Sequence, residues 1–453
     1  MKIVIAGAGE VGYHLIENLY RDYPDITVID TLVDVLEKLR QEFAVHTELS
    51  NIVDCSLFSK HGMEDVDLFL AITNFDETNM IACKMAKEAG ASTTVCRIRQ
   101  IDLSGSQQKQ TLTTLGIDVV INPVELVANE LTRLSLMPNL LEVHPFLNGD
   151  LQLYGYKMTD YSSLIGKTCK EIQNWVHNHI GELVLILRNE RSIVPTPEQE
   201  IQLGDHVYFL IQERIHSNLR EYLGFAQYQR GRRRIFINGG GHIGLRLAHS
   251  LDSKGYEIKV IEINQERSYN ISEKLQSSLV LNFDGLDKNQ LLAEGIEEAD
   301  AFFSVTNNEE LNITACMMAR HLGVDRTLAL VKQPEMLAIV EHATPIGGAI
   351  SPRMVTARHL TQYIKGTGKG TVVSIAHVEI QEIILDEDTP CLGQHLKDLD
   401  CPSDLRVVMV KRGHELIIPT STSKLQNGDH IILSFHHMDR SISQDLFSAQ
   451  RIN

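Results

Sequence analysis

The sequence predicts an α/β protein with two tandem Rossmann-like, doubly wound parallel-sheet domains, each followed by a small α/β module. Three observations predict this fold class. Strand-like apolar runs alternate with helix-length segments, a glycine-rich turn follows the first run of each half, and the second half repeats the landmarks of the first in the same order. Such alternation is typical of βαβ units and a mostly parallel sheet.

The repeat is visible in short stretches of identical or similar residues. Residues 2–12 read KIVIAGAGEVG, and residues 234–244 read RIFINGGGHIG. Thr73-Asn74 recurs as Thr306-Asn307, and Gly204-Asp205-His206 recurs as Gly428-Asp429-His430. Shared landmarks in a fixed order indicate that one two-domain unit was duplicated.

The repeat sets the expected domain boundaries. We expect Rossmann-like domains at residues 1–142 and 234–370, small modules at 143–226 and 371–453, and a basic, solvated linker at 227–233. In the first domain the pattern predicts a helix over Tyr13–Tyr20 after the glycine-rich turn. The expected strands are Lys2–Ala6, Ile26–Asp30, Ala44–Thr47, Leu68–Thr73, Thr93–Ile98 and Val119–Asn122.

Composition excludes several classes of function. The formal charge of −17 disfavours binding to nucleic acid or to an anionic membrane, because both would repel the protein. No apolar run approaches the length of a membrane helix, and the N-terminus has no secretory signal pattern. The seven cysteines contain no CxxC pair, which fits a reducing cytoplasm. We therefore expect a cytoplasmic protein that reaches a membrane only through a protein partner.

The glycine-rich turns predict a dinucleotide site in each half. In a GxGxxG turn between a strand and a helix, the first glycine makes the turn, the second lets the pyrophosphate approach and the third allows close packing. The helix N-terminus then faces the phosphates. The candidate binding residues of the turns are Gly7, Ala8, Gly9, Glu10, Val11 and Gly12 in the first half, and Gly239, Gly240, Gly241, His242, Ile243 and Gly244 in the second.

Further candidates lie at later strand ends. Asp30 and Glu262 can accept hydrogen bonds from ribose hydroxyls and would repel a 2′-phosphate, so NAD(H) is preferred over NADP(H). ATP and ADP carry the same ribose and are further candidates. Thr73-Asn74 and Thr306-Asn307 either line the ligand or cap the next helix. Arg97 either meets a phosphate or forms an ion pair.

These residues together resemble the TrkA family, the regulatory subunits of Trk-type potassium transporters with tandem RCK (also called KTN) domains. The resemblance rests on residues 2–12, Asp30, the run LAITNFDETNM at 70–80, Arg97-Ile98-Arg99 and their repeats; Asp284 keeps an acid that the family places after its third strand. It implies a cytosolic regulator that binds NAD(H) and adenine nucleotides, forms a homo-oligomeric ring and gates a membrane potassium subunit of the TrkH/TrkG type. It also implies that the small modules are RCK C-terminal domains, that the protein is peripheral at the inner face of the membrane, and that it is not an enzyme.

Two alternatives stay open at this point. The same domains could regulate a potassium efflux system or another ion transporter. An NAD-dependent dehydrogenase would need an acid or base beside the nicotinamide and a substrate pocket, for which dehydrogenases usually devote a sizeable second domain. The modules of this chain are short, and their shared landmarks are turn residues. No metal ligands, catalytic residues or nucleic-acid contacts are predicted.

Overall fold

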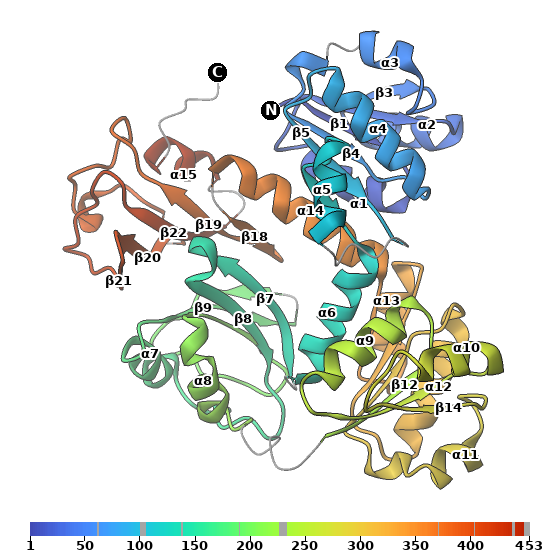
Figure 1. The fold of residues 1–453 in the computed structure, drawn as a ribbon. Coiled ribbons are helices and arrows are strands. Elements are labelled where there is room, and N and C mark those ends of the chain that lie inside the picture. Colours follow the sequence, from blue (N-terminus) through green and yellow to red (C-terminus); the bar gives the residue numbers. More distant parts are fainter. Residues whose placement is uncertain are drawn as a thin grey trace. The chain divides into compact units, whose positions relative to one another are not determined.

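The computed structural model describes residues 1–60, 63–99, 106–136, 139–189, 191–225, 233–369, 371–402, 404–436 and 440–447 (Figure 1). The chain divides into two compact units, each assembled from two separate stretches. Unit 1 contains residues 1–135 and 231–361, and unit 2 contains residues 136–230 and 362–453. Most of the predicted linker at 227–233 lies outside the described residues.

The first half of unit 1 is a six-stranded sheet with strand order β3-β2-β1-β4-β5-β6, and every neighbouring pair is parallel. This is the Rossmann order, which reverses direction between β1 and β4. The strands are β1 (Ile3–Ala6), β2 (Ile26–Asp30), β3 (His46–Leu49), β4 (Leu68–Ala71), β5 (Thr93–Arg97) and β6 (Val119–Ile121). The helices are α1 (Glu10–Leu19), α2 (Val33–Glu42), α3 (Cys55–Lys60), α4 (Asp76–Glu88), α5 (Ser106–Thr114) and α6 (Pro123–Leu136).

The second half of unit 1 repeats this topology, with strand order β14-β13-β12-β15-β16-β17 and parallel pairing throughout. The strands are β12 (Arg234–Asn238), β13 (Glu257–Ile261), β14 (Leu279–Leu281), β15 (Ala301–Ser304), β16 (Thr327–Leu330) and β17 (Gly348–Ile350). The helices are α9 (His242–Asp252), α10 (Gln265–Ser272), α11 (Lys288–Ala293), α12 (Glu309–His321), α13 (Glu335–Ala343) and α14 (Pro352–Lys369).

Unit 2 contains two five-stranded antiparallel sheets with matching orders, β10-β9-β11-β8-β7 and β18-β19-β22-β20-β21. In the first module the elements are β7 (Leu140–Phe146), β8 (Leu151–Lys157), α7 (Cys169–His177), β9 (Glu182–Arg188), β10 (Arg191–Ile193), β11 (His206–Ile211) and α8 (His216–Tyr222). In the second they are β18 (Val372–Ile375), β19 (Val378–Ile384), β20 (Arg406–Arg412), β21 (Glu415–Ile417), β22 (His430–His436) and α15 (Arg440–Phe447).

The central strands of the parallel sheets are apolar because helices cover both of their faces. β1 and β4 are buried at every position, as the continuous apolar runs predict. One covering helix comes from the other half of the chain: Val127, Ala128 and Leu131 of α6 belong to the core of the second sheet. The two stretches of unit 1 therefore share a hydrophobic core.

The predicted fold class is confirmed, with differences at element ends. The helix predicted over Tyr13–Tyr20 begins earlier, at Glu10, because the extended backbone of Gly9 already serves as its N-cap. The third strand is displaced to His46–Leu49. In the part of the chain that the structure describes, no helix combines the length and the apolar character that a membrane span requires.

Candidate functional site

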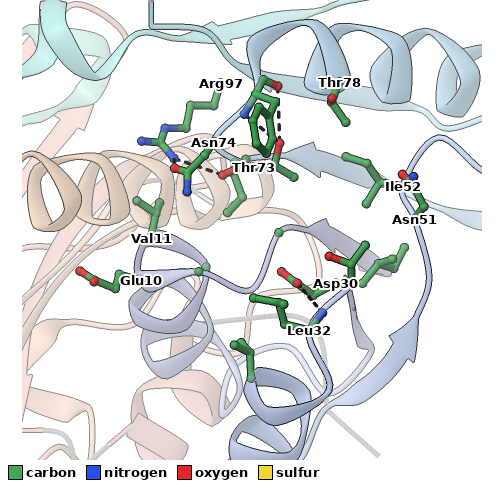
Figure 2. A pocket seen from close by; sticks show the side chains of 18 of the residues that line it. Glu10, Val11, Asp30, Leu32, Asn51, Ile52, Thr73, Asn74, Thr78 and Arg97 are labelled. Atoms are coloured by element: carbon green, nitrogen blue, oxygen red, sulfur yellow. Dashed lines mark hydrogen bonds between the residues drawn. The ribbon is translucent and has the colours of Figure 1, made fainter.

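A pocket of about 570 Å³ opens where β1, β2, β4 and β5 end (Figure 2). This is the edge at which open α/β sheets bind ligands, next to the point where the strand order reverses. Nine of the ten residues predicted for the first half line it, and Ala8 lies in the same turn. The lining residues are Gly7, Gly9, Glu10, Val11, Gly12, Ile29, Asp30, Thr31, Leu32, Val35, Asn51, Ile52, Ile72, Thr73, Asn74, Phe75, Thr78, Arg97 and Arg353.

The three glycines of the turn have different steric roles. Gly7 has a φ of +115°, a conformation that side chains other than glycine rarely adopt. A Cβ on Gly12 would lie 2.2 Å from the carbonyl oxygen of Gly7, so this position is closed by packing. A Cβ on Gly9 would have no atom of the described residues within 4 Å. The space beside Gly9 is therefore free for a ligand at the N-terminus of α1.

Asp30 is held by two backbone hydrogen bonds. Its Oδ2 accepts from the Ala8 N–H at 2.7 Å, and its Oδ1 accepts from the Leu32 N–H at 3.0 Å. These bonds fix the carboxylate at the end of β2 and tie it to the glycine-rich turn. Each carboxylate oxygen keeps accepting capacity, so the group can still take hydrogen bonds from the hydroxyls of a ribose.

Hydrogen bonds from the side chain of Asn79, in α4, hold the Thr73-Asn74 loop in place. The Asn79 side chain accepts from the Thr73 N–H at 3.0 Å and from the Thr73 hydroxyl at 2.6 Å, and it donates to the Arg97 carbonyl at 2.9 Å. The N-cap of α4 is Phe75, so the interpretation of Thr73-Asn74 as a helix cap is wrong. The pair instead lines the pocket.

Arg97 is a buried cation that donates its described hydrogen bonds to neutral oxygen atoms and has a favourable charge interaction with Asp76. It is 9% exposed, and its guanidinium donates to the Ile72 carbonyl at 3.3 Å and to the Asn74 side-chain oxygen at 3.4 Å. Burial, followed by the charge of Arg99, lowers the pKa of Arg97 to about 10, which still leaves it protonated near neutral pH. Its Nε is buried and has no hydrogen-bond partner among the residues that the structure describes. Such a group favours a bound anion, because an anion would compensate a charge that the fold has removed from water.

The second half builds the same turn with a more enclosed acid. Gly239 has a φ of +110°, and a Cβ on Gly244 would lie 1.9 Å from the Gly239 carbonyl oxygen. Glu262 is 4% exposed and accepts from the Gly240 N–H at 3.0 Å. The guanidinium of Arg267 lies 3.4 Å from the same carboxylate. This acid is therefore already engaged from two sides.

The remaining residues predicted for the second half lie around this turn. Thr306 is bound by Asn312 as Thr73 is by Asn79, and Asn307 follows it as an exposed residue. His242 is exposed at the start of α9. Ile243 is partly buried and packs against the hydrophobic core of the second sheet, which includes Val305. Asp284 is exposed and accepts from the Leu286 N–H at 3.0 Å, an intraloop contact.

Sequence reasoning missed two groups of lining residues. The first is apolar and exposed at the rim: Leu32 is 59% exposed and Phe75 is 68% exposed. An apolar residue two positions after the strand-end acid and another directly after the Thr-Asn pair were usable signals, since apolar side chains suit the faces of a nucleobase. The second is Arg353 of α14, which belongs to the other half of the chain and offered no signal near the motif.

The chain is similar to known proteins along nearly its whole length. The TrkA-N domain model matches residues 3–123 and 235–352, and the TrkA-C domain model matches residues 380–437. The Trk system potassium uptake protein TrkA of Halomonas elongata is 32% identical over 446 residues, covering 96% of this chain and 95% of the relative. The chain belongs to the TrkA family. Its counterpart from Vibrio alginolyticus is 30% identical over 443 residues, with 96% and 95% covered.

Two solved structures share the fold of this chain at low sequence identity. The GsuK channel superposes with a TM-score of 0.64 at 17% identity, covering 99% of this chain and 79% of that chain. The crystal structure of the GsuK RCK domain gives a TM-score of 0.61 at 16% identity, with 99% and 95% covered. The expectation of tandem RCK domains is thereby confirmed for the fold.

Proposed function

We propose that this protein is the cytosolic regulatory subunit of a Trk-type potassium uptake system, and that it binds NAD(H) or an adenine nucleotide in the pocket of its first half. The observation that carries the proposal is the pocket itself, with an open helix N-terminus at Gly9, a strand-end acid at Asp30 and a buried cation at Arg97. This is a diphosphate nucleotide site by its chemistry. The names of the relatives supply the transport system.

The regulatory part of the proposal follows from the two-domain repeat. The protein assembles into a homo-oligomeric ring and acts on a membrane-embedded potassium-translocating subunit of the TrkH/TrkG type, at the inner face of the membrane. A nucleotide changes transport only to the extent that it binds one conformation of the regulator better than another. The role is one of sensing, so the bound nucleotide is not consumed.

The first test is calorimetric titration of the full-length protein with NADH, NAD⁺, ATP, ADP and NADPH. NAD was bound in one solved form of the GsuK channel, which makes it the first ligand to try. Asp30→Ala should weaken binding about tenfold or more, because charge-assisted hydrogen bonds to the ribose are lost. Asp34→Ala is the matched control, since Asp34 is an exposed acid in the first turn of α2. No saturable binding of any of these ligands would refute the nucleotide proposal.

The second test is growth on limiting potassium. Deletion of the gene should impair growth at low potassium, and the wild-type gene should restore it better than the Asp30→Ala variant does. Altered sensitivity to potassium efflux with normal uptake would instead favour a regulator of another transporter. Steady oxidation of NADH by the purified protein in the presence of a small carbonyl substrate would favour a dehydrogenase.

A further inference from the structure

The wall of the first pocket contains a residue from the opposite half of the chain. Arg353 is the second residue of α14, the helix that follows the last strand of the second parallel sheet. It lines the pocket together with the glycine-rich turn of the first sheet. Its guanidinium forms an ion pair with Glu10, and the two side chains are 34% and 47% exposed.

Glu10 places a carboxylate at a helix N-terminus that would otherwise bind phosphate. It directly follows Gly9 and is the first residue of α1, where unpaired N–H groups and the positive end of the helix dipole attract phosphate. A carboxylate at this position would repel the same phosphate. In the present structure Arg353 neutralises that carboxylate, so the ion pair occupies the anion-binding end of the pocket.

The residues at the two ends of the pocket indicate where the phosphates of a nucleotide would lie. In Figure 2, Glu10 and Arg97 lie toward one end of the pocket, and Asn51 and Ile52 lie toward the other, with Asp30 on their side. A nucleotide whose ribose meets Asp30 would extend its phosphates toward Glu10. Two arginines then border the phosphate end, Arg97 from the first half and Arg353 from the second.

We propose that Arg353 leaves Glu10 and binds the outer phosphate of the nucleotide, so that a ligand in the first half is held by a helix of the second half. This deepens the proposed function and rests on it. A doubly charged phosphate offers a guanidinium a stronger partner than one partly exposed carboxylate, and the bidentate geometry is equally available. The affinity of the site for nucleotide then depends on the position of α14.

The proposal predicts a dependence on the number of phosphates. AMP places its single phosphate near the helix N-terminus, whereas ADP and ATP extend further toward Arg353. Arg353→Ala should weaken ATP binding about 10- to 100-fold, the range for a hydrogen bond to a charged group, and should leave AMP binding within about threefold. Glu10→Gln should strengthen ATP binding a few-fold, because it removes both the competing partner and the repulsion.

The experiment compares the affinity ratio of ATP to AMP, by calorimetry at fixed salt, in the full-length wild type, Arg353→Ala and Glu10→Gln. Arg358→Ala is the matched control, because Arg358 lies on the same helix and pairs with Glu130 at 3.1 Å, and it is not among the residues that line the pocket. The expected result is a ratio that collapses in Arg353→Ala and is unchanged in Arg358→Ala.

Two results would overturn the inference alone. One is an unchanged ATP affinity in Arg353→Ala, and the other is an equal loss for AMP and ATP, which would indicate a structural role. Hydrogen exchange provides an independent readout: ATP should slow exchange in the first turns of α14 in the wild type and not in Arg353→Ala. Failure of the wild type to bind any nucleotide would refute the inference together with the proposed function, so the two failures are distinguishable.

Discussion

Replacing Asn79 with alanine should loosen the loop that forms one wall of the nucleotide pocket. The Asn79 side chain is fully buried and makes four hydrogen bonds: it accepts from the Thr73 N–H and hydroxyl, and it donates to the carbonyls of Thr73, at 3.1 Å, and Arg97, at 2.9 Å. Alanine leaves the backbone groups without these partners. The fold around α4 should persist, because its apolar contacts to the sheet are made by other residues.

The magnitude follows from the groups that lose their partners. A buried polar group left unsatisfied costs about 1–3 kcal/mol. The Arg97 carbonyl makes the one buried bond of the described set and takes that full range, while the part-buried Thr73 N–H adds about 1 kcal/mol, so the local opening free energy should fall by about 2–4 kcal/mol. Since every 1.4 kcal/mol is a factor of ten, amide exchange at residues 72–75 should accelerate by about 30- to 700-fold.

Native-state hydrogen exchange is the appropriate assay, because a protein of several domains does not unfold in one step and the effect is local. Asn18→Ala is the control: this exposed amide donates to the His14 carbonyl at 2.8 Å, its only hydrogen bond within the described part of the chain, and its loss should change exchange near Thr73 less than twofold. An acceleration below threefold in Asn79→Ala would show that the loop does not depend on the side chain. Asn312→Ala should loosen the corresponding loop of the second half and leave Thr73 unchanged.

Three further predictions concern the turn and the first module. Gly9→Ala should keep the melting temperature and weaken nucleotide binding, whereas Gly12→Ala should cost about 1–3 kcal/mol of stability, as a thermal scan of both variants would show. Asp205→Asn should destabilise the first module by about 2–4 kcal/mol, because the buried Asp205 carboxylate accepts hydrogen bonds from Nε and one terminal nitrogen of Arg188, each at 2.7 Å. An unchanged urea midpoint would contradict this. Burial lowers the pKa of His216 from 6.5 to about 4, so the fold favours the neutral imidazole. The resulting stabilisation, up to about 3 kcal/mol, is fully present above pH 6.5 and is lost as the pH falls toward 4. His216→Asn should flatten that pH dependence in urea titrations.

The sequence was sufficient for the parallel sheets because their signals are local. Continuous apolar runs predicted the buried strands, and the glycines at 7, 9 and 12 predicted the turn that joins the first strand to α1. The start of α1 was misplaced because a glycine N-cap gives no side-chain signal. The boundaries of the five predicted segments stay a prediction, because each compact unit combines a stretch of the first half with the corresponding stretch of the second half.

The candidate site was predictable where its residues follow strand ends. Asp30 and Arg97 are the last residues of β2 and β5, Thr73 lies two residues after β4, and parallel strands end at one edge. Arg353 was not predictable in this way, because its place depends on how α14 crosses toward the first sheet. The ion pair of buried Glu262 with Arg267 was also beyond the motif, since Arg267 lies on the following helix.

The packing of α6 carries a consequence for the history of this chain. Val127, Ala128 and Leu131 fill the core of a sheet that is encoded by the other half of the gene. A half-length product would leave those apolar side chains in water and the second sheet without one of its covering helices. Once a helix of the first copy had become part of the core of the second, the second copy could no longer fold as a separate protein, and the two copies had to evolve as one chain.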